Sequence, residues 1–220
     1  NELQRKKYFS TIGEMASLIA HEVRNPIFAI SSIAKILMQK YGGPEDGRFI
    51  DSILRETERL NALVEDLLNY GKPLSLEKKP VPVGKLINNS LNGLSSYLEE
   101  SGCKLELSAT GGETTVSVDQ ERIKQVFYNI IRNAVDAGAT QITVSVGRER
   151  RFKKIVVKDN GRGIRAADME KVMKPFFTTK KSGTGLGLPI CKKIIEAHGG
   201  RFLLKSKEGE GTEITMAFKE

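Results

Sequence analysis

The feature that most constrains the fold is a pair of apolar stripes at helical spacing in the first 70 residues. From Leu3 to Leu37 apolar residues recur mostly at steps of three and four, and the pattern stops at YGGP, residues 41–44. A second stripe, from Ile50 to Leu67, alternates strictly between these two steps, which is typical of a bundle or coiled-coil seam. Because two helices alone cannot bury both stripes, we expect a homodimer whose paired hairpins form a four-helix bundle. The alternative is that the hairpin packs on the rest of its own chain.

The remainder of the chain mixes helical and strand patterns without regular alternation. This mixture predicts an α+β sandwich, a mixed sheet with helices on one face, after the N-terminal hairpin. We therefore expect a helical hairpin at residues 1–72, a linker at 73–80 and a second domain at 81–220. The expected helices of that domain are 84–101, 119–137 and 184–198, and the expected strands are 104–109, 115–118, 140–146, 152–158, 201–206 and 212–218.

Charge is distributed unevenly between the two parts. Residues 1–72 hold 10 basic and 10 acidic side chains, so the net charge of +8 belongs to the rest of the chain. A basic domain suits a polyphosphate ligand, nucleic acid or an acidic protein partner. The chain has no Trp and no interleaving of aromatic with basic residues, which argues against nucleic acid. The basic run RERRFKK, residues 148–154, lies between two alternating stretches and is predicted to be a solvated hairpin tip.

Composition and cysteine usage predict the cellular setting of the chain. A composition of 39% hydrophobic and 28% charged residues is that of a globular protein, and neither a membrane-spanning run nor a signal-peptide pattern is visible. Cys103 and Cys191 fit no metal-ligand spacing, so we expect a reduced, cytoplasmic setting. Because the chain begins with Asn1 rather than Met, we expect a piece of a longer protein whose sensor or membrane anchor lies elsewhere.

Two carboxamides stand one helical turn apart in the stretch QVFYNIIRNAVDAG, residues 125–138. Asn129 and Asn133 share a helix face opposite Ile130 and Ile131. Carboxamide oxygens on one face can ligate a hard cation such as Mg²⁺ without adding negative charge beside a triphosphate. We therefore expect Asn129 and Asn133 to be metal ligands, and a merely solvated polar face is the alternative.

A carboxylate followed by glycines ends the predicted strand KKIVVKD. Asp159 is followed by Gly161 and Gly163, and these glycines allow the backbone to approach a planar ligand. Asp159 can then accept a hydrogen bond from an exocyclic amine such as that of adenine. The alternative is an ordinary Asn-Gly hairpin turn.

Alternating glycines precede the last predicted helix. Free N–H groups at a helix start favour phosphate oxygens, although the stretch is neither a P-loop nor a dinucleotide-binding fingerprint. Upstream, Phe176 and Phe177 can close over a base or dock on another surface, and Lys180 or Lys181 can reach phosphates. The residues expected to contact phosphate in this stretch are Gly183, Thr184, Gly185, Leu186 and Gly187.

Taken in order, these stretches resemble the catalytic core of a bacterial sensor histidine kinase of two-component systems. HEVRNP (21–26) resembles the family's histidine box, NIIRNAVDAG (129–138) its asparagine box, and DNGRGI (159–164) its first glycine box. KPFFTT (174–179), GTGLGL (183–188) and GEGT (209–212), which contributes Thr212, resemble the phenylalanine box and two further glycine boxes. Asp136 makes the asparagine box most similar to the nitrogen-regulation and dicarboxylate-sensor branch.

The resemblance implies a dimerisation and phosphotransfer hairpin followed by a Bergerat-type ATP-binding domain. It also implies ATP, Mg²⁺ and an acidic response-regulator partner. In this reading His21 receives phosphate, and Glu22 is the general base that accepts the Nδ1 hydrogen and leaves Nε2 to attack. Pro26 removes one helical hydrogen bond and is predicted to bend the helix near His21. Asn25 is implied to orient a water that hydrolyses the regulator's phosphoaspartate.

A second class, the chaperone-like or clamp ATPases that share this nucleotide fold, is the alternative. Such a protein would have no reason to retain HEVRNP. Families of that kind usually carry a glutamate where this chain has Asn129. The sequence therefore favours a histidine kinase that transfers phosphate to a response regulator, with phosphatase activity as a further expectation.

Overall fold

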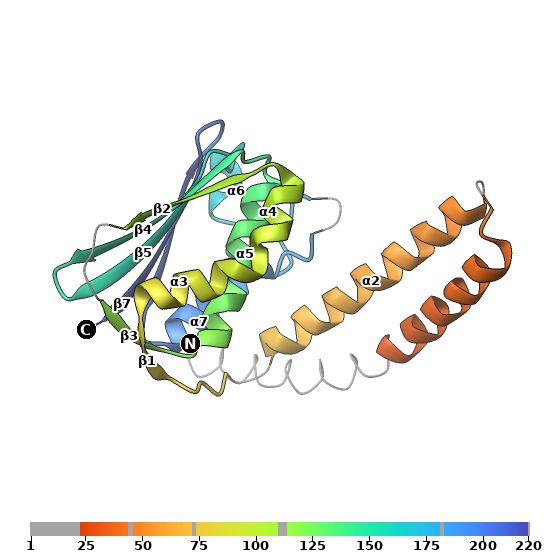
Figure 1. The fold of residues 1–220 in the computed structure, drawn as a ribbon, viewed down its shortest axis with the longest axis horizontal. Helices are drawn as coiled ribbons and strands as arrows, with labels where there is room; N and C mark the ends of the chain where they lie inside the picture. The colour runs from red at the N-terminus through yellow and green to blue at the C-terminus, as the bar shows by residue number, and fades with distance from the viewer. Residues whose placement is uncertain (1–22, 44–45, 72–73, 110–113, 181–182, 220) are drawn as a thin grey trace. The chain divides into compact units, whose positions relative to one another are not determined.

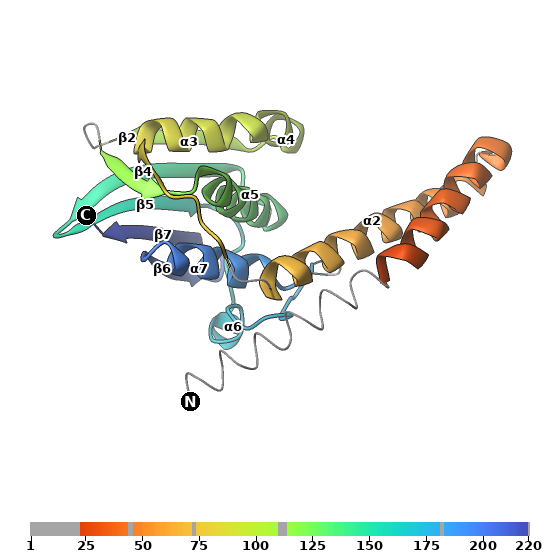
Figure 2. The ribbon, with the colours of Figure 1, turned by 90° about the horizontal axis from the view of Figure 1, so that it is seen from below.

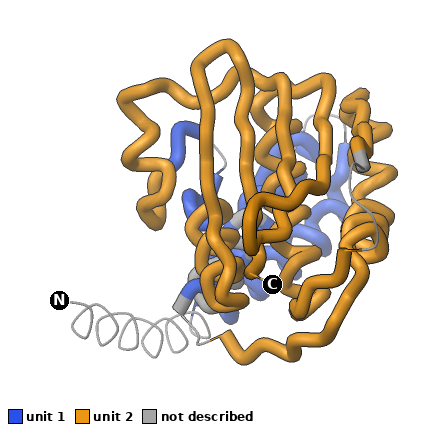
Figure 3. Tube along the Cα trace, turned by 90° about the vertical axis from the view of Figure 1, so that its left-hand side faces the viewer, with its two compact units in different colours: residues 1–73, 178–186 blue, residues 74–177, 187–220 orange. Residues whose placement is uncertain are grey.

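In the computed structural model the chain is described over residues 23–43, 46–71, 74–109, 114–180 and 183–219. Two compact units, coloured separately in Figure 3, comprise residues 1–73 with 178–186 and residues 74–177 with 187–220. Each unit is built around its own buried residues. The structure confirms the predicted α+β chain, in which a helical N-terminal part precedes a sheet domain.

The first unit contains a helix over residues 23–41 and helix α2, Asp46–Gly71. The first helix ends at Tyr41, where Gly42 and Gly43 follow, as the turn sequence predicts. The two helices run beside each other as a hairpin (Figure 1). Inside the hairpin, Ile27 and Val64 form a buried cluster. The predicted pair of helices is therefore present.

The second unit is a layered α/β domain. Its five-stranded sheet has the order β2-β4-β5-β7-β6, in which β2 and β4 are parallel and the other neighbours are antiparallel. A separate antiparallel pair joins β1 to β3. The strands are β1 (Lys79–Pro82), β2 (Lys104–Ala109), β3 (Thr115–Val118), β4 (Gln141–Glu149), β5 (Phe152–Asp159), β6 (Arg201–Lys207) and β7 (Gly211–Lys219).

Helices cover one face of this sheet (Figure 1, Figure 2). Strand alternation gives that face its apolar side chains, and Val144, Val157 and Ile214 pair across three neighbouring strands and are buried. Phe127 and Ile131 of the central helix are fully buried in this unit. The helices are α3 (Val83–Leu91), η1 (Asn92–Leu94), α4 (Ser95–Ser101), α5 (Gln120–Asp136), α6 (Ala166–Met169) and α7 (Gly187–Ala197).

Two expected helices differ from the structure at their ends or middle. The helix expected over 84–101 is divided by a 3-10 turn at Asn92 and Gly93, two poor helix formers. The break lets Leu94 and Leu98 reach the interior. The helix expected from residue 184 begins at Gly187, because Gly185 has a left-handed φ of +69°. The run 148–154 is the β4–β5 hairpin, as predicted.

Candidate functional site

The carboxyl group of Asp159 is the best-defined polar feature of the sheet domain. Asp159 ends β5 and is only 8% exposed. Its Oδ1 atom accepts hydrogen bonds from the backbone N–H groups of Gly161 (2.8 Å) and Thr212 (3.2 Å). Burial raises the pKa of Asp159, and these two hydrogen bonds only partly oppose the increase. Within the described residues Oδ2 has no hydrogen-bond partner, so it can accept a bond from a ligand.

The glycines beside Asp159 allow one stretch of backbone to approach another. A Cβ atom on Gly211, whose φ is +89°, would lie 2.0 Å from the carbonyl oxygen of Asp159. A Cβ on Gly163, with φ of +65°, would lie 2.1 Å from the carbonyl oxygen of Lys207. Gly161 and Gly163 are predicted from the sequence to allow the approach of a ligand. The structure shows that Gly163 also packs against the β6–β7 turn, whereas a Cβ on Gly161 would lie 3.0 Å from the Cβ of Ala137, just after α5.

A hydroxyl network that was not predicted from the sequence connects β6 and the start of β7 to the segment that follows β5. Ser206 donates to the carbonyl oxygen of Gly211 (2.7 Å) and accepts from the backbone N–H of Ile164 (2.9 Å). Its Oγ atom is also 3.0 Å from the Thr212 hydroxyl. Asn160 connects the end of β5 to the start of β4, because its Oδ1 accepts hydrogen bonds from the backbone N–H groups of residues 140 and 141. No sequence motif marks Ser206, whereas Asn160 lies inside DNGRGI.

Asn129 and Asn133 occupy one face of α5, as their spacing predicts. Both are half-buried, and Ile130 and Ile131 on the other side are buried. A Cβ atom on Gly187, at the start of α7, would lie 3.8 Å from Nδ2 of Asn133 and 3.9 Å from Cγ of Asn129. The structure therefore brings both carboxamides next to the beginning of α7. Their oxygens are suited to a hard cation.

Aromatic residues precede the glycine-rich stretch. Phe176 is 58% exposed and has a φ of +67°, a left-handed conformation that is strained for an aromatic residue. Phe177 is half-buried, and its N–H donates to the carbonyl oxygen of Lys174 (3.3 Å). This turn holds the two rings in different environments.

Residues 178–186 group with the first compact unit. There the Lys180 N–H donates to the Thr178 hydroxyl (3.1 Å), and the Thr184 hydroxyl accepts from the N–H of Leu186 (3.2 Å). Gly183 is half-buried, and Leu186 is fully buried. All of these hydrogen bonds are between residues of the stretch itself. The phosphate contacts expected of Gly183, Thr184, Gly185 and Lys180 stay predictions.

The N-terminal motif is only partly described. His21 and Glu22 lie outside the described residues, so their predicted roles stay predictions. Asn25 is exposed on the first helix, four residues from the position of His21. Pro26 lies within the described helix and is also exposed.

The second histidine, His198, has a structural environment. Its Nε2 accepts a hydrogen bond from the backbone N–H of Asp119 (2.9 Å), so the ring hydrogen is on Nδ1 and is donated to the carbonyl oxygen of Ile194 (2.7 Å). Burial lowers the pKa of His198, and the ammonium group of Lys78 lowers it further. His198 therefore caps the end of α7 in its neutral form.

Over the described residues there is no cluster of three or more His, Cys, Asp or Glu side chains placed to hold a metal ion. The described helices include none with the length and apolar character needed to cross a membrane. Cys103 and Cys191 are buried and form no disulfide.

Two family models match the chain. Residues 118–220 match the model of the histidine kinase-, DNA gyrase B- and HSP90-like ATPases, and residues 11–75 match the His Kinase A phospho-acceptor domain. The sensor histidine kinase ZraS of Escherichia coli (strain K12) is 34% identical over 98% of this chain. The chain belongs to the sensor histidine kinases.

Other sensor kinases show the same relationship. Sporulation kinase C of Bacillus subtilis (strain 168) is 32% identical over 92% of this chain. The chain spans about half the length of these curated relatives, 47% of ZraS and 48% of sporulation kinase C.

Solved kinase structures share the fold. The histidine kinase ThkA, in its complex with the response regulator protein TrrA, has a TM-score of 0.73 and 29% identity over 99% of this chain and 64% of its own. Full-length ShkA, crystallised with AMPPNP, has a TM-score of 0.77 over 93% of this chain and 45% of its own, and its 22% identity supports the fold alone. These likenesses confirm the Bergerat fold of the sheet domain.

Proposed function

We propose that this chain phosphorylates itself on His21 with ATP and passes the phosphoryl group to an aspartate of a response regulator. The observation that carries the proposal is that residues 11–75, which contain His21, match a phospho-acceptor domain in the same chain as an ATPase-type domain. A clamp or chaperone-like ATPase would need only the second of these. The proposed domains are the hairpin at 1–72, the linker at 73–80 and the ATP-binding domain at 81–220.

The buried carboxylate of Asp159 supports adenine binding. Its Oδ1 is held by two backbone N–H groups, which leaves Oδ2 to accept the exocyclic amine of the base. Gly161, Gly163 and Thr212 shape this end of the site, and Phe177 borders the base.

The phosphates of ATP are assigned to the glycine-rich stretch and the two carboxamides. Asn129 and Asn133 would hold Mg²⁺ through their side-chain oxygens, and the ion would neutralise charge on the phosphates. Their position beside Gly187 supports this assignment. The remaining phosphate contacts are assigned to Lys180, Gly183, Thr184, Gly185, Leu186 and Gly187.

His21 is the acceptor in the proposed reaction. Its Nε2 forms a bond to the γ-phosphorus while the bond to the β–γ bridging oxygen breaks and ADP leaves. Glu22 accepts the Nδ1 hydrogen and fixes the tautomer in which Nε2 has a free lone pair. A bend at Pro26 would give the histidine two positions relative to the rest of its helix.

Dimerisation is supported by two heptad rows of apolar residues in the hairpin. Ile27 and Ala34 on the first helix, and Ile50 and Val64 on α2, are less than 9% exposed. A second set of rows at the same seven-residue spacing stays open to solvent, with exposures between 37% and 48%. These residues are Val23, Ile30 and Leu37 on the first helix and Ile53 and Leu60 on α2. A second hairpin would cover these rows and complete a four-helix bundle.

A response regulator is the proposed partner. ThkA has been crystallised with the response regulator protein TrrA, and this chain is similar to ThkA over 99% of its length. The proposed docking surface is the part of the bundle below His21. There Asn25, exposed on the first helix, would orient a water for phosphatase activity. The upstream sensor domain, the cytoplasmic setting and the nitrogen-regulation type of asparagine box are further parts of the proposal.

Incubation with γ-labelled ATP and Mg²⁺ tests the proposal directly. Wild-type protein should acquire a label that is stable in alkali and lost in acid, as a phosphohistidine is. His21→Ala should acquire none while binding ATP as wild type does. His198→Gln is the matched control and should still be labelled. Steady ATP hydrolysis without a phosphoenzyme would instead identify a clamp-type ATPase and reject the kinase proposal.

A further inference from the structure

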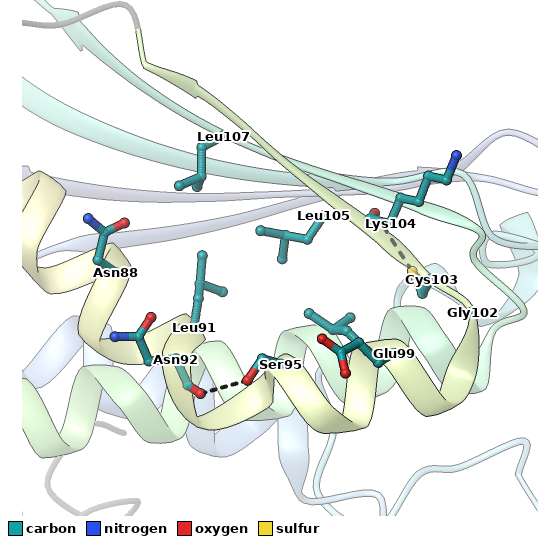
Figure 4. Close-up of a pocket in the computed structure, with 11 residues that line it drawn as sticks. Asn88, Leu91, Asn92, Ser95, Glu99, Gly102, Cys103, Lys104, Leu105 and Leu107 are labelled. Atoms are coloured by element: carbon teal, nitrogen blue, oxygen red, sulfur yellow. Dashed lines mark hydrogen bonds between the residues drawn. The ribbon is translucent and has the colours of Figure 1, made fainter.

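A groove lies on the sheet domain between β2 and the helices α3 and α4 (Figure 4). Its volume is about 530 Å³, within the range of ordinary ligand pockets. Leu91, Leu98, Leu105 and Leu107 form its apolar walls. Asn88 and Asn92 lie one helical turn apart on its rim and are exposed. The groove is thus apolar inside, and its helix side carries the two carboxamides together with the carboxylate of Glu99, while Lys104 borders it at the start of β2.

The strand that forms one wall is an edge strand. In the described part of the chain β2 pairs only with β4, so its other side has no neighbouring strand. The backbone N–H of Lys104 donates to the carbonyl oxygen of Thr140 (2.9 Å), which fixes the direction of the ladder. In a parallel ladder alternate residues bond to the same neighbour. The N–H and C=O groups of Leu105 and Leu107 therefore project from the free edge.

Apolar side chains of β2 are left partly exposed on the groove side. Leu107 is 50% exposed, and Leu105 beside it is half-buried. Edge strands in soluble proteins are usually protected from pairing by charges, prolines or bulges. Here the charges of Lys104 and Glu106 are on the opposite face of the strand, because side chains alternate. The groove side of the edge keeps two leucines and unpaired backbone groups.

We propose that this groove binds an extended polypeptide segment that adds to the free edge of β2 as a sixth strand. Main-chain hydrogen bonds to Leu105 and Leu107 would hold the segment, and every second side chain would enter the groove. The side chain between two such positions would lie beside the exposed Glu106. The partner is therefore a segment in which two aliphatic residues flank a lysine or arginine. Charge complementarity with Glu106 selects the basic residue, and the leucine walls select the aliphatic pair.

A synthetic peptide tests the surface without knowledge of the natural partner. The probe is acetyl-Thr-Val-Lys-Val-Thr-amide, and the control is the isomer acetyl-Val-Thr-Lys-Thr-Val-amide, which places threonines rather than valines toward the groove. Amide hydrogen exchange is followed by NMR on the 220-residue chain. The probe should slow exchange at the N–H groups of Leu105 and Leu107, while those of Lys104 and Glu106, which already face β4, should change little. The control peptide should bind at least 10-fold more weakly.

Two substitutions separate this surface from a general effect. Leu107→Lys should weaken probe binding at least 10-fold, because it places a charge in the apolar groove. Leu203→Lys is the matched control, since Leu203 is also 50% exposed but lies on β6 at the other edge of the sheet. Glu106→Lys should reverse the preference toward a peptide carrying Glu in place of Lys.

Three results would overturn the proposal. The first is exchange at Leu105 and Leu107 that is unchanged by millimolar probe. The second is equal binding by wild type and Leu107→Lys. The third is protection of these amides that rises with protein concentration in the absence of peptide, because a second copy of the chain would then be the occupant.

Discussion

Replacing Asp159 with asparagine should invert the base preference of the nucleotide site. In the wild type, Oδ1 accepts two backbone N–H groups at 2.8 and 3.2 Å. An asparagine carbonyl oxygen would keep that position, because its NH₂ group cannot accept either bond. The NH₂ would then take the place of Oδ2 and face the exocyclic amine of adenine, so that two donors meet.

The expected loss follows from the hydrogen bond that is removed. A hydrogen bond to a charged group contributes about 1.5–3 kcal/mol, and an unpaired buried donor adds to the loss. We expect ATP to bind Asp159→Asn roughly 30- to 150-fold more weakly, which corresponds to about 2–3 kcal/mol. Inosine triphosphate carries a carbonyl oxygen in place of the amine. It should bind the variant more tightly than it binds wild type.

Stability should change in the opposite direction from affinity. Burial raises the pKa of Asp159, so the charged carboxylate destabilises the folded state as the pH rises through that pKa. Asp159→Asn should therefore have a higher melting temperature than wild type at pH 8, with a smaller difference at pH 4. A variant that is more stable yet binds ATP poorly cannot be explained by misfolding.

Calorimetric titration with both nucleotides measures the inversion. Asp168→Asn is the matched control, because Asp168 is 7% exposed but its Oδ2 forms an ion pair with Arg165 at 2.7 Å. That variant should lose stability and change ATP affinity by less than about threefold. If Asp159→Asn bound ATP as tightly as wild type, or kept the wild-type preference for ATP, the role of Oδ2 would be refuted.

Further predictions concern three other features. Gly211→Ala should lower the free energy of unfolding by at least about 3 kcal/mol in chemical denaturation, because its Cβ would meet the carbonyl oxygen of Asp159. Gly209→Ala, at a similar φ of +79° with open space around it, should lower it by only about 1 kcal/mol. Burial depresses the pKa of His198, so the contribution of His198 to stability should be lost as the pH falls below 6.5 and through the pKa of the folded state. His198→Gln should therefore show a shallower dependence of the melting temperature on acid pH. In analytical ultracentrifugation, Ile53→Lys should yield monomers. Asp51→Lys, at an exposed position outside the open rows, is the control and should sediment as wild type does. A monomeric wild type would contradict the proposed bundle.

Much of the fold was predictable because its signals are local. Periodicity located the two helices of the hairpin and six of the seven strands of the sheet domain, whereas β1 (Lys79–Pro82), which begins inside the predicted linker, was not predicted. The start of α5 was also predicted, and there Asp119 accepts the N–H of Arg122 at 3.2 Å. Local signals failed where tertiary packing decides the conformation. The break at Asn92–Leu94 depends on bringing Leu94 inward, and the late start of α7 depends on the conformation of Gly185.

The candidate site divides in the same way. The spacing of Asn129 and Asn133 predicts a shared helix face, but only the fold shows that Gly187 begins α7 beside both of them. The motif DNGRGI points to Asp159, yet nothing in it indicates that one carboxylate oxygen is already held by Gly161 and Thr212. Thr212 is 53 residues further along the chain, and a contact of that range leaves no periodic trace.

The sequence by itself determined the class of the protein, since its six boxes keep their order and type along the chain, and it determined the apolar stripes that require a partner helix pair. Tertiary structure decided which oxygen of Asp159 is open, which heptad rows of the hairpin are covered, and that β2 is an edge strand with a leucine-lined groove. The physical reason is the distance along the chain over which each interaction acts. Helix and strand propensities act over a few neighbouring residues, whereas burial and hydrogen-bond satisfaction depend on segments that meet only when the chain has folded.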